Sequence, residues 1–193
     1  QAPRVHIPIM QLDAALARIE RATKVGEPAV TGVCVHATTL QSRRSRESYF
    51  KWLSQIDPAL RRPLFITINE IERGTPLMSI SEWCVGLRAY VSRISLNLHY
   101  ADHAIGSIGS TGAWAAGFHL PVFAGAQHAA RAQALRRQIG FWSKTLRSQG
   151  MGLTVHGFQD AAFLEDARAM GVDLLTSDAH WPFEAIHDST AHH

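Results

Sequence analysis

Apolar segments of strand length alternate with amphipathic helical segments from residue 29 almost to the end of the chain. This alternation limits the possible folds more than any other feature. The near-continuous apolar run Val33, Cys34 and Val35 is typical of a strand that is covered on both faces, as in parallel sheets. Strands that alternate with helices predict βα units joined by right-handed crossovers. The sequence therefore predicts an α/β protein with a parallel sheet.

The expected elements can be placed by periodicity and by turn residues. Strands are predicted at residues 29–37, 63–71, 91–98, 119–123, 153–155 and 172–175, and helices at 11–24, 46–55, 80–90, 127–149 and 160–170. A further extended segment is expected near residue 6, where Pro8 argues against a central strand. The Gly- and Ser-rich residues 101–113 are expected to form a loop.

The number of units indicates a barrel with fewer strands than usual. The predicted strands are fewer than the eight strands of a complete (β/α)8, TIM-like barrel. We therefore expect a barrel that is incomplete or irregularly closed at its N-terminal side. The gap would be covered by the helix at 11–24 or by a second chain. Periodicity cannot separate this barrel from a doubly wound sheet, which stays open as an alternative.

Length and charge indicate one domain without a nucleic-acid surface. The 193 residues are assigned to a single domain, with an N-terminal strand/helix element at 1–28, βα repeats at 29–186 and a tail at 187–193. The net charge is +3, and the arginines are spread over several segments. Arginines spread in this way are typical of solvated helical faces, so no nucleic acid is expected as a partner.

The cysteines and the hydropathy pattern favour a cytoplasmic protein. Cys34 and Cys84 lie in apolar segments without a CxxC pair, which indicates buried free thiols in a reducing compartment. No apolar run approaches the roughly 18 residues of a membrane span, and no signal peptide is evident. Because the chain starts at Gln1 rather than at Met, we expect further sequence to precede it in the full protein.

Several strand motifs follow one another in an order that resembles a known family. They are Val35-His36-Ala37-Thr38, Ile66-Thr67-Ile68-Asn69-Glu70, Asn97-Leu98 and Val155-His156-Gly157-Phe158-Gln159. Their order and spacing resemble the EAL family, the barrel phosphodiesterases that cleave cyclic di-GMP, over residues 31–184. Residues 164–175 resemble the last helix and strand of that family. The Glu-Ala-Leu strand itself has no match in this chain.

The resemblance implies that most metal ligands of the family are replaced. The family's ligand positions fall on His36, Thr67, Asn97, Leu98 and His156, and one family glutamate remains, as Glu70. A metal-dependent hydrolase cannot work without charged oxygen ligands. The resemblance therefore implies the scaffold of an enzyme that has lost its chemistry, and we expect no catalytic residue, no metal and no cofactor.

The C-terminal ends of the strands define a candidate binding pocket, because these ends line the functional face of parallel barrels. Its expected members are His36, Thr67, Glu70, Asn97, His99, His156 and Asp178. Three histidines with one or two carboxylates could instead hold zinc or another transition metal. The alternative function is therefore a metal-dependent phosphodiesterase or hydrolase with a His-rich site.

The favoured interpretation is a catalytically inactive EAL-like regulatory domain that acts through protein contacts. A protein partner or a homodimer is expected. Residual cyclic di-GMP binding is the weaker expectation, because no Arg or Lys stands at the strand ends to face its phosphates. Large aromatic side chains near loops are candidate contact residues, namely Trp114, Phe118, Trp181 and Phe183. The competing interpretation is that these aromatics fill the ends of the barrel.

Overall fold

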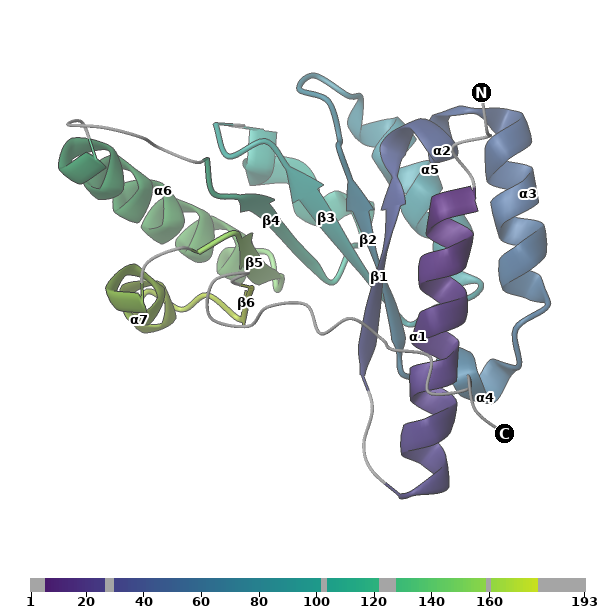
Figure 1. Cartoon of the computed structure of the whole chain (residues 1–193). Helices are drawn as coiled ribbons and strands as arrows, with labels where there is room; N and C mark the ends of the chain where they lie inside the picture. Colours follow the sequence, from purple (N-terminus) through teal and green to yellow (C-terminus); the bar gives the residue numbers. More distant parts are fainter. Residues whose placement is uncertain (1–5, 27–29, 102–103, 122–127, 159–160, 177–193) are drawn as a thin grey trace.

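A six-stranded parallel sheet forms the centre of the protein (Figure 1), whose computed structural model describes residues 6–26, 30–101, 104–121, 128–158 and 161–176. The strands are β1 (Thr31–His36), β2 (Leu64–Asn69), β3 (Arg93–Leu98), β4 (Ala115–His119), β5 (Gly152–His156) and β6 (Leu174–Leu175). Their order in the sheet is their order in the chain, and every neighbouring pair is parallel. This half-barrel confirms the predicted incomplete TIM-like barrel. The alternative of a doubly wound sheet is excluded because the strand order never reverses.

One helix precedes the first strand, and the others occupy the connections between strands. The longer ones are α1 (His6–Lys24), α3 (Arg43–Ser54), α5 (Leu77–Arg88), α6 (His128–Ser148) and α7 (Ala161–Ala169). The shorter ones are α2 (Ala37–Gln41), α4 (Pro58–Arg61) and the 3-10 helix η1 (Ala104–Thr111). Figure 1 shows α1 and α3 beside β1 at one end of the sheet, and α6 and α7 beside β5 and β6 at the other.

Alternate strand residues build the core on the outer, helix-covered face of the sheet. The buried set includes Val33, Val35, Ile66, Ile68, Leu96 and Val155. Contact of the Phe118 ring with Trp142 of α6, at 4.8 Å between ring centroids, shows that these positions face the helices. Removing such apolar side chains from water is the main favourable term in folding.

The N-terminal segment differs from the sequence-based expectation. Residues near His6 were expected to be extended, but α1 begins at His6 and runs to Lys24. Pro8 is compatible with this because it lies in the first turn, where the backbone N–H of a helix has no intrahelical partner. The predicted helix at 11–24 is thus confirmed as part of α1. Leu12 and Ile19 are buried, and α1 packs against the edge strand β1.

The fourth strand lies four residues earlier than predicted. Residues 119–123 were expected to form it, but β4 spans Ala115–His119. Its small residues Ala115, Ala116 and Gly117 lack the usual strand-forming side chains, so they gave no signal in the sequence. Tertiary packing determines the strand here, because the small side chains let β4 pair closely with β3 and β5.

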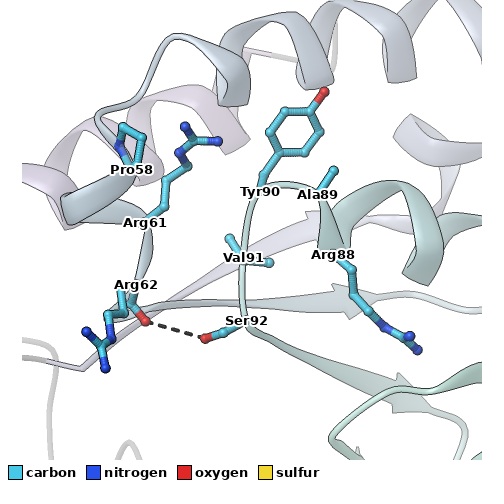
Figure 2. Close-up of a pocket in the computed structure, with 8 residues that line it drawn as sticks. All are labelled: Pro58, Arg61, Arg62, Arg88, Ala89, Tyr90, Val91 and Ser92. Atoms are coloured by element: carbon cyan, nitrogen blue, oxygen red, sulfur yellow. Dashed lines mark hydrogen bonds between the residues drawn. The ribbon is translucent and has the colours of Figure 1, made fainter.

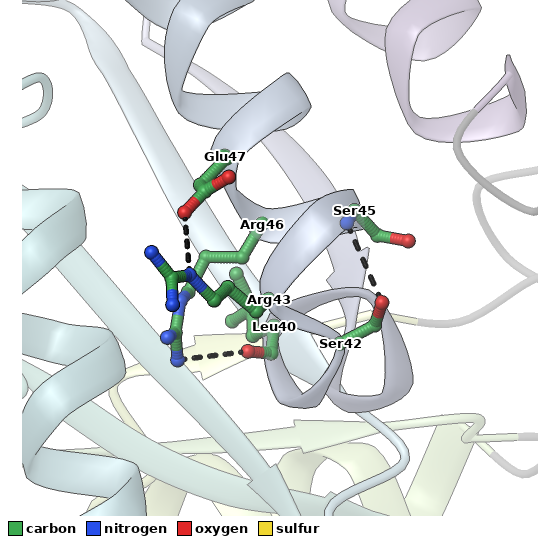
Figure 3. A network of polar contacts seen from close by, with 6 residues as sticks. All are labelled: Leu40, Ser42, Arg43, Ser45, Arg46 and Glu47. Atoms are coloured by element: carbon green, nitrogen blue, oxygen red, sulfur yellow. Dashed lines mark hydrogen bonds and ion pairs between the residues drawn. The ribbon is translucent and has the colours of Figure 1, made fainter.

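Two connections are more ordered than their sequences suggest. The Gly- and Ser-rich stretch forms η1, and the amide N–H of Gly109 donates to Gln149 Oε1 at 2.7 Å. After β1, the chain turns through α2 into α3 (Figure 3), where the Ser42 side chain caps α3 by accepting from the Ser45 amide. Arg46 Nη1 donates to the Leu40 carbonyl at 3.2 Å. These contacts hold the turn that follows the C-terminal end of β1.

Candidate functional site

Strand residues between the core positions place polar side chains on the inner face of the half-barrel. The register sets Cys34 beside Thr67, and Thr67 beside Ser95, so one polar row crosses β1, β2 and β3. Thr67 and Ser95 are buried. Burial raises the pKa of the Cys34 thiol, while a hydrogen bond with the Asn69 side chain lowers it by a smaller amount. The row is therefore neutral.

A second polar row lies at the C-terminal ends of the same strands. Asn97 Nδ2 donates to Asn69 Oδ1 at 3.2 Å. At the end of β1, His36 Nδ1 lies 2.9 Å from Glu70 Oε2, where the His36 side chain is half-buried and the Glu70 side chain is exposed. Glu70 has a φ of 57°, in the left-handed region that non-glycine residues rarely adopt. This backbone conformation directs the chain out of β2 at the point where the Glu70 carboxylate meets His36.

Histidines from β4 and β5 meet at the same end of the sheet. His119 and His156 are partners in the strand register, and their ring centroids lie 5.0 Å apart. His156 Nδ1 is hydrogen-bonded to Thr176 Oγ1 at 2.9 Å. Burial, together with the nearby His119, lowers the pKa of His156 from 6.5 to about 4. The His156 ring is therefore neutral at physiological pH.

A pocket of about 230 Å³ opens between the ends of β2, β3 and β4. Its lining includes Glu70, Asn97, His99, Tyr100 and His119. His99 Nδ1 accepts a hydrogen bond from the Ala101 amide, which places the ring proton of a neutral His99 on Nε2. The pocket thus offers hydrogen-bond donors, hydrogen-bond acceptors and the Glu70 carboxylate.

The structure brings together only part of the predicted pocket. Glu70, Asn97 and His99 line the cavity, and His36 reaches it indirectly through Glu70. Thr67 lies one row deeper in the sheet. His156 belongs to the neighbouring pair with His119, and Asp178 lies outside the described residues.

Two residues of this end were not identified from the sequence. Asn69 was seen only as part of a motif, and His119 was placed at the start of a strand rather than at its end. The period-two alternation of side chains along β2 would have identified Asn69, since it shares a face with Thr67. His119 could not be identified while β4 was misplaced.

The candidate contact aromatics do not share one surface. Trp114 precedes β4, at the end of the sheet opposite the pocket, and its side chain is 38% exposed, with the Arg93 guanidinium 4.9 Å from its ring centroid. Phe118 is fully buried against Trp142. The prediction of Phe118 as a contact residue is therefore corrected, because its position faces α6 rather than solvent. Trp181 and Phe183 lie outside the described residues.

Comparison with solved structures places this architecture among known folds. An EAL domain protein from Listeria monocytogenes EGD-e superposes with a TM-score of 0.58 and 17% identity, over 89% of this chain and 67% of the other. The EAL domain of FimX from Xanthomonas citri, in complex with c-di-GMP, gives a TM-score of 0.64 and 13% identity, over 90% of this chain and 68% of the other. The protein has an EAL-like fold.

A third structure with this EAL-like fold carries a metal ion. BlrP1 of Klebsiella pneumoniae, in a manganese and cyclic di-GMP complex, gives a TM-score of 0.57 and 10% identity, over 86% of this chain and 42% of the other. No protein-family model matches the sequence, and no curated protein matches it either. The EAL-like fold is therefore recognised from structure rather than from overall sequence similarity.

The described residues of this EAL-like domain do not fit a hard divalent cation. Manganese and magnesium are held mainly by carboxylate, carbonyl and water oxygens. Asn97 at the C-terminal strand ends and Thr67 one row deeper are neutral, and the Glu70 carboxylate is paired with His36. Within the described ranges, no three His, Cys, Asp or Glu side chains converge in a way that could hold a metal ion. Among the same residues, no helix is both long and apolar enough to span a membrane.

Proposed function

We propose that this chain is a catalytically inactive EAL-like regulatory domain that acts in cyclic di-GMP signalling through protein contacts. The observation that carries the proposal is the absence of clustered carboxylates among the described residues at the C-terminal strand ends. Hydroxyl, amide and imidazole groups occupy the inner face there, and the Glu70 carboxylate is exposed and bonded to His36. Such groups can bind a ligand by hydrogen bonds. They lack the clustered carboxylates with which a hard divalent cation is held to activate a water molecule for phosphodiester hydrolysis.

The test is a turnover assay with cyclic di-GMP in the presence of Mg²⁺ or Mn²⁺. Chromatography of the reaction products should show no hydrolysis by this chain, whereas the PaMucR phosphodiesterase, another structural neighbour, serves as the positive control. Metal-dependent hydrolysis by the wild-type chain that disappears in Glu70→Gln would overturn the proposal. His36→Gln is the matched variant, because it removes the partner of Glu70 without changing a carboxylate.

Metal analysis separates this proposal from the alternative of a His-rich hydrolase. His119 lies against His156, His36 pairs with Glu70 and His99 lies against Tyr100, and within the described residues no three His, Cys, Asp or Glu side chains form one ligand set. We expect the purified protein to carry no stoichiometric zinc or other transition metal. One metal ion per chain, lost in His156→Gln together with a hydrolytic activity, would favour the alternative.

Cyclic di-GMP binding without hydrolysis is the second candidate function. FimX and the Bacillus subtilis YkuI protein, both structural neighbours, are in complex with c-di-GMP. In this chain the pocket beside Asn97, Tyr100 and His119 lies at the C-terminal ends of the strands. None of the described residues that line it is an Arg or a Lys that could face two phosphates, so we expect isothermal titration calorimetry to show no binding tighter than about 10 μM. Tight binding that is lost in Asn97→Ala would instead support a nucleotide receptor.

The contact surface is proposed to include Trp114. Its ring is partly exposed at the end of the sheet away from the pocket, and Arg93 lies over it. Trp and Arg are both enriched at interaction hot spots. Trp114→Ala should weaken self-association or partner capture while the monomer stays folded, as judged by sedimentation and by circular dichroism. If Trp114→Ala instead prevents folding and shows no separate defect in association, Trp114 fills the end of the barrel.

The free cysteines bear on the cellular compartment in which the protein acts. Cys34 and Cys84 are both free thiols in the structure, and Cys84 is fully buried. Unpaired cysteines are typical of reducing compartments, so we propose a cytoplasmic site of action. Fractionation of cells that express the full-length protein tests this.

A further inference from the structure

Basic side chains gather at the end of the sheet where the strands begin. In a parallel βα fold, the helix before each strand runs back to the start of that strand, so helix C-termini meet at this end. Most of these helices have a basic residue in the last turn, and Arg62 and Arg93 lie close to the starts of β2 and β3. The helix-final cations are Lys24 (α1), Lys51 (α3), Arg61 (α4), Arg88 (α5), Arg147 (α6) and Arg168 (α7). We call these residues the basic end.

Most cations of the basic end have no carboxylate partner in the described part of the chain. Arg168 pairs with Glu165 at 2.7 Å, whereas the other ion pairs of the described residues lie elsewhere. Two carboxylates near the strand starts, those of Asp57 and Asp173, each accept a hydrogen bond from a backbone amide at 2.8 Å. The basic end therefore presents positive charge that the described carboxylates do not pair.

Helix electrostatics explains part of the basic end. A cation in the last turn of a helix interacts favourably with the helix dipole, and Arg88 also donates to the Thr111 carbonyl at 3.1 Å. Arg93 is exposed and lies in a strand, so it has no such role. Around the pocket in Figure 2, the guanidinium groups of Arg61, Arg62 and Arg88 point away from one another. The charge is thus spread over a surface and is not directed at one small anion.

Large apolar side chains are exposed at the same end. Val25 follows α1 and is 69% exposed, and Val30 precedes β1 and is 66% exposed. Trp114 directly precedes β4 and is 38% exposed, with the Arg93 guanidinium 4.9 Å from its ring centroid. One exposed apolar side chain is ordinary, but two valines and a tryptophan beside several cations form a combined pattern. Apolar side chains flanked by Lys and Arg, with Trp at headgroup depth, are typical of proteins that lie on a membrane surface.

We propose that the basic end docks this domain on a membrane surface that contains anionic lipids. Diverging cations can each contact a separate headgroup on a flat surface, while Val25 and Val30 enter the apolar boundary below the headgroups. The cytoplasmic leaflet is negatively charged and attracts such a surface. Docking through the strand starts leaves the pocket at the C-terminal strand ends facing away from the lipid. The proposal goes beyond the protein contacts proposed above and shares Trp114 with them, so a protein partner and a membrane would compete for this residue.

The test is co-sedimentation of the whole chain with vesicles of phosphatidylcholine that contain about 30% phosphatidylglycerol. We expect binding at low salt that weakens at least about tenfold with pure phosphatidylcholine vesicles or at about 0.5 M salt. Arg62→Gln and Arg93→Gln should each weaken binding about fivefold, because each removes one cation near the lipid. Val25→Ser should weaken it about threefold without changing its salt dependence.

Arg44→Gln is the matched control. Arg44 is also exposed, but it lies in the first turn of α3, at the opposite end of the sheet. This variant should bind the anionic vesicles as the wild type does, and circular dichroism should show that all four variants are folded. The change at Arg44 removes the same charge as the changes at Arg62 and Arg93, so the comparison separates a docking face from general attraction between charges.

Three results would overturn the proposal. The first is an absence of binding to the anionic vesicles, and the second is an equal loss of binding in Arg44→Gln and Arg62→Gln. The third is binding of a polyglutamate peptide as tight as that of the vesicles, with no effect of Val25→Ser on either, which would identify an acidic protein segment as the partner. The turnover and self-association assays contain no lipid, so their outcomes are independent of this one.

Discussion

His156 is a buried imidazole whose protonation opposes folding. Its pKa is lowered from 6.5 to about 4, mainly by burial and then by His119. Between these two pH values the unfolded chain holds a proton on His156 that the folded chain lacks, so stability falls as the pH falls. The full effect is about 3 kcal/mol and is reached near pH 4. Thermal unfolding of the wild type between pH 7 and pH 4 should show this loss.

Two variants isolate the contribution of His156. His156→Gln removes the titrating ring, so its stability should depend less on pH between 6.5 and 4 than that of the wild type. His99→Gln, at an exposed position of the same end, should keep the wild-type dependence. A pH dependence that His156→Gln leaves unchanged would contradict the assignment.

The Tyr49 hydroxyl is a second buried polar group with a measurable cost. Tyr49 is fully buried on α3, and its hydroxyl has no hydrogen-bond partner among the described residues. Burial raises the pKa of Tyr49, which keeps the phenol neutral. Removing an unsatisfied buried hydroxyl relieves its desolvation penalty, so Tyr49→Phe should stabilise the protein by about 1 kcal/mol. Tyr49→Ala, which leaves a cavity, should cost about 3–5 kcal/mol in urea unfolding. A destabilised Tyr49→Phe would show that the hydroxyl has a partner.

Strand β4 packs closely against its neighbour β5 at Gly117. A Cβ at Gly117 would overlap the carbonyl and the hydroxyl of Thr154 on the neighbouring strand β5. Because a strand backbone cannot move aside as a flexible side chain can, Gly117→Ala should lower stability by about 3 kcal/mol. Gly140→Ala is the matched control: Gly140 lies inside α6 with free space around a Cβ, so the change should add about 1 kcal/mol. Chemical denaturation of both variants tests the contrast, and equal effects would refute it.

The same element marks where sequence reasoning fails. Strands β1, β2, β3 and β5 carry Val, Ile or Leu at alternate positions, and these strands were predicted from that pattern. β4 instead has small residues, which allow its backbone to lie close to the neighbouring strands. This limit on side-chain size arises from the assembled sheet, so it leaves no pattern in the sequence. As a result Phe118 was placed near a loop and His119 at the wrong end of its strand. The short helix α4 was also missed, since four residues are too few to show a helical period.

At the scale of the whole molecule, the parallel sheet made part of the site predictable. Parallel strands bring their C-terminal ends to one edge, so Glu70, Asn97 and His99 could be grouped from their order alone. Side-chain pairing could not be derived in this way. The contact of His36 with Glu70 depends on a left-handed backbone at Glu70, and the grouping of His119 with His156 depends on strand register.

Helix α1 is a structural part of the half-barrel rather than a separate N-terminal extension. It buries Leu12 and Ile19 and packs along β1. A shortened chain that starts at residue 30 would expose apolar side chains of the edge strand, which favours association between chains. We expect this shortened chain to aggregate or to lose cooperative thermal unfolding. Ile19→Ala should cost about 2–5 kcal/mol in the complete chain, whereas Val25→Ser, at an exposed position, should change little. A shortened chain that melts like the wild type would contradict this role.

Agreement between strand order and chain order has a consequence for synthesis on the ribosome. Each βα unit that emerges can pair at once with the strand made just before it, so no unit has to wait for a distant partner. The nascent sheet always ends in one open edge, which moves from β1 towards β6 as the chain grows. A pause in translation would therefore leave a partly built sheet with a pairing edge exposed, and chaperones would be needed most at such pauses.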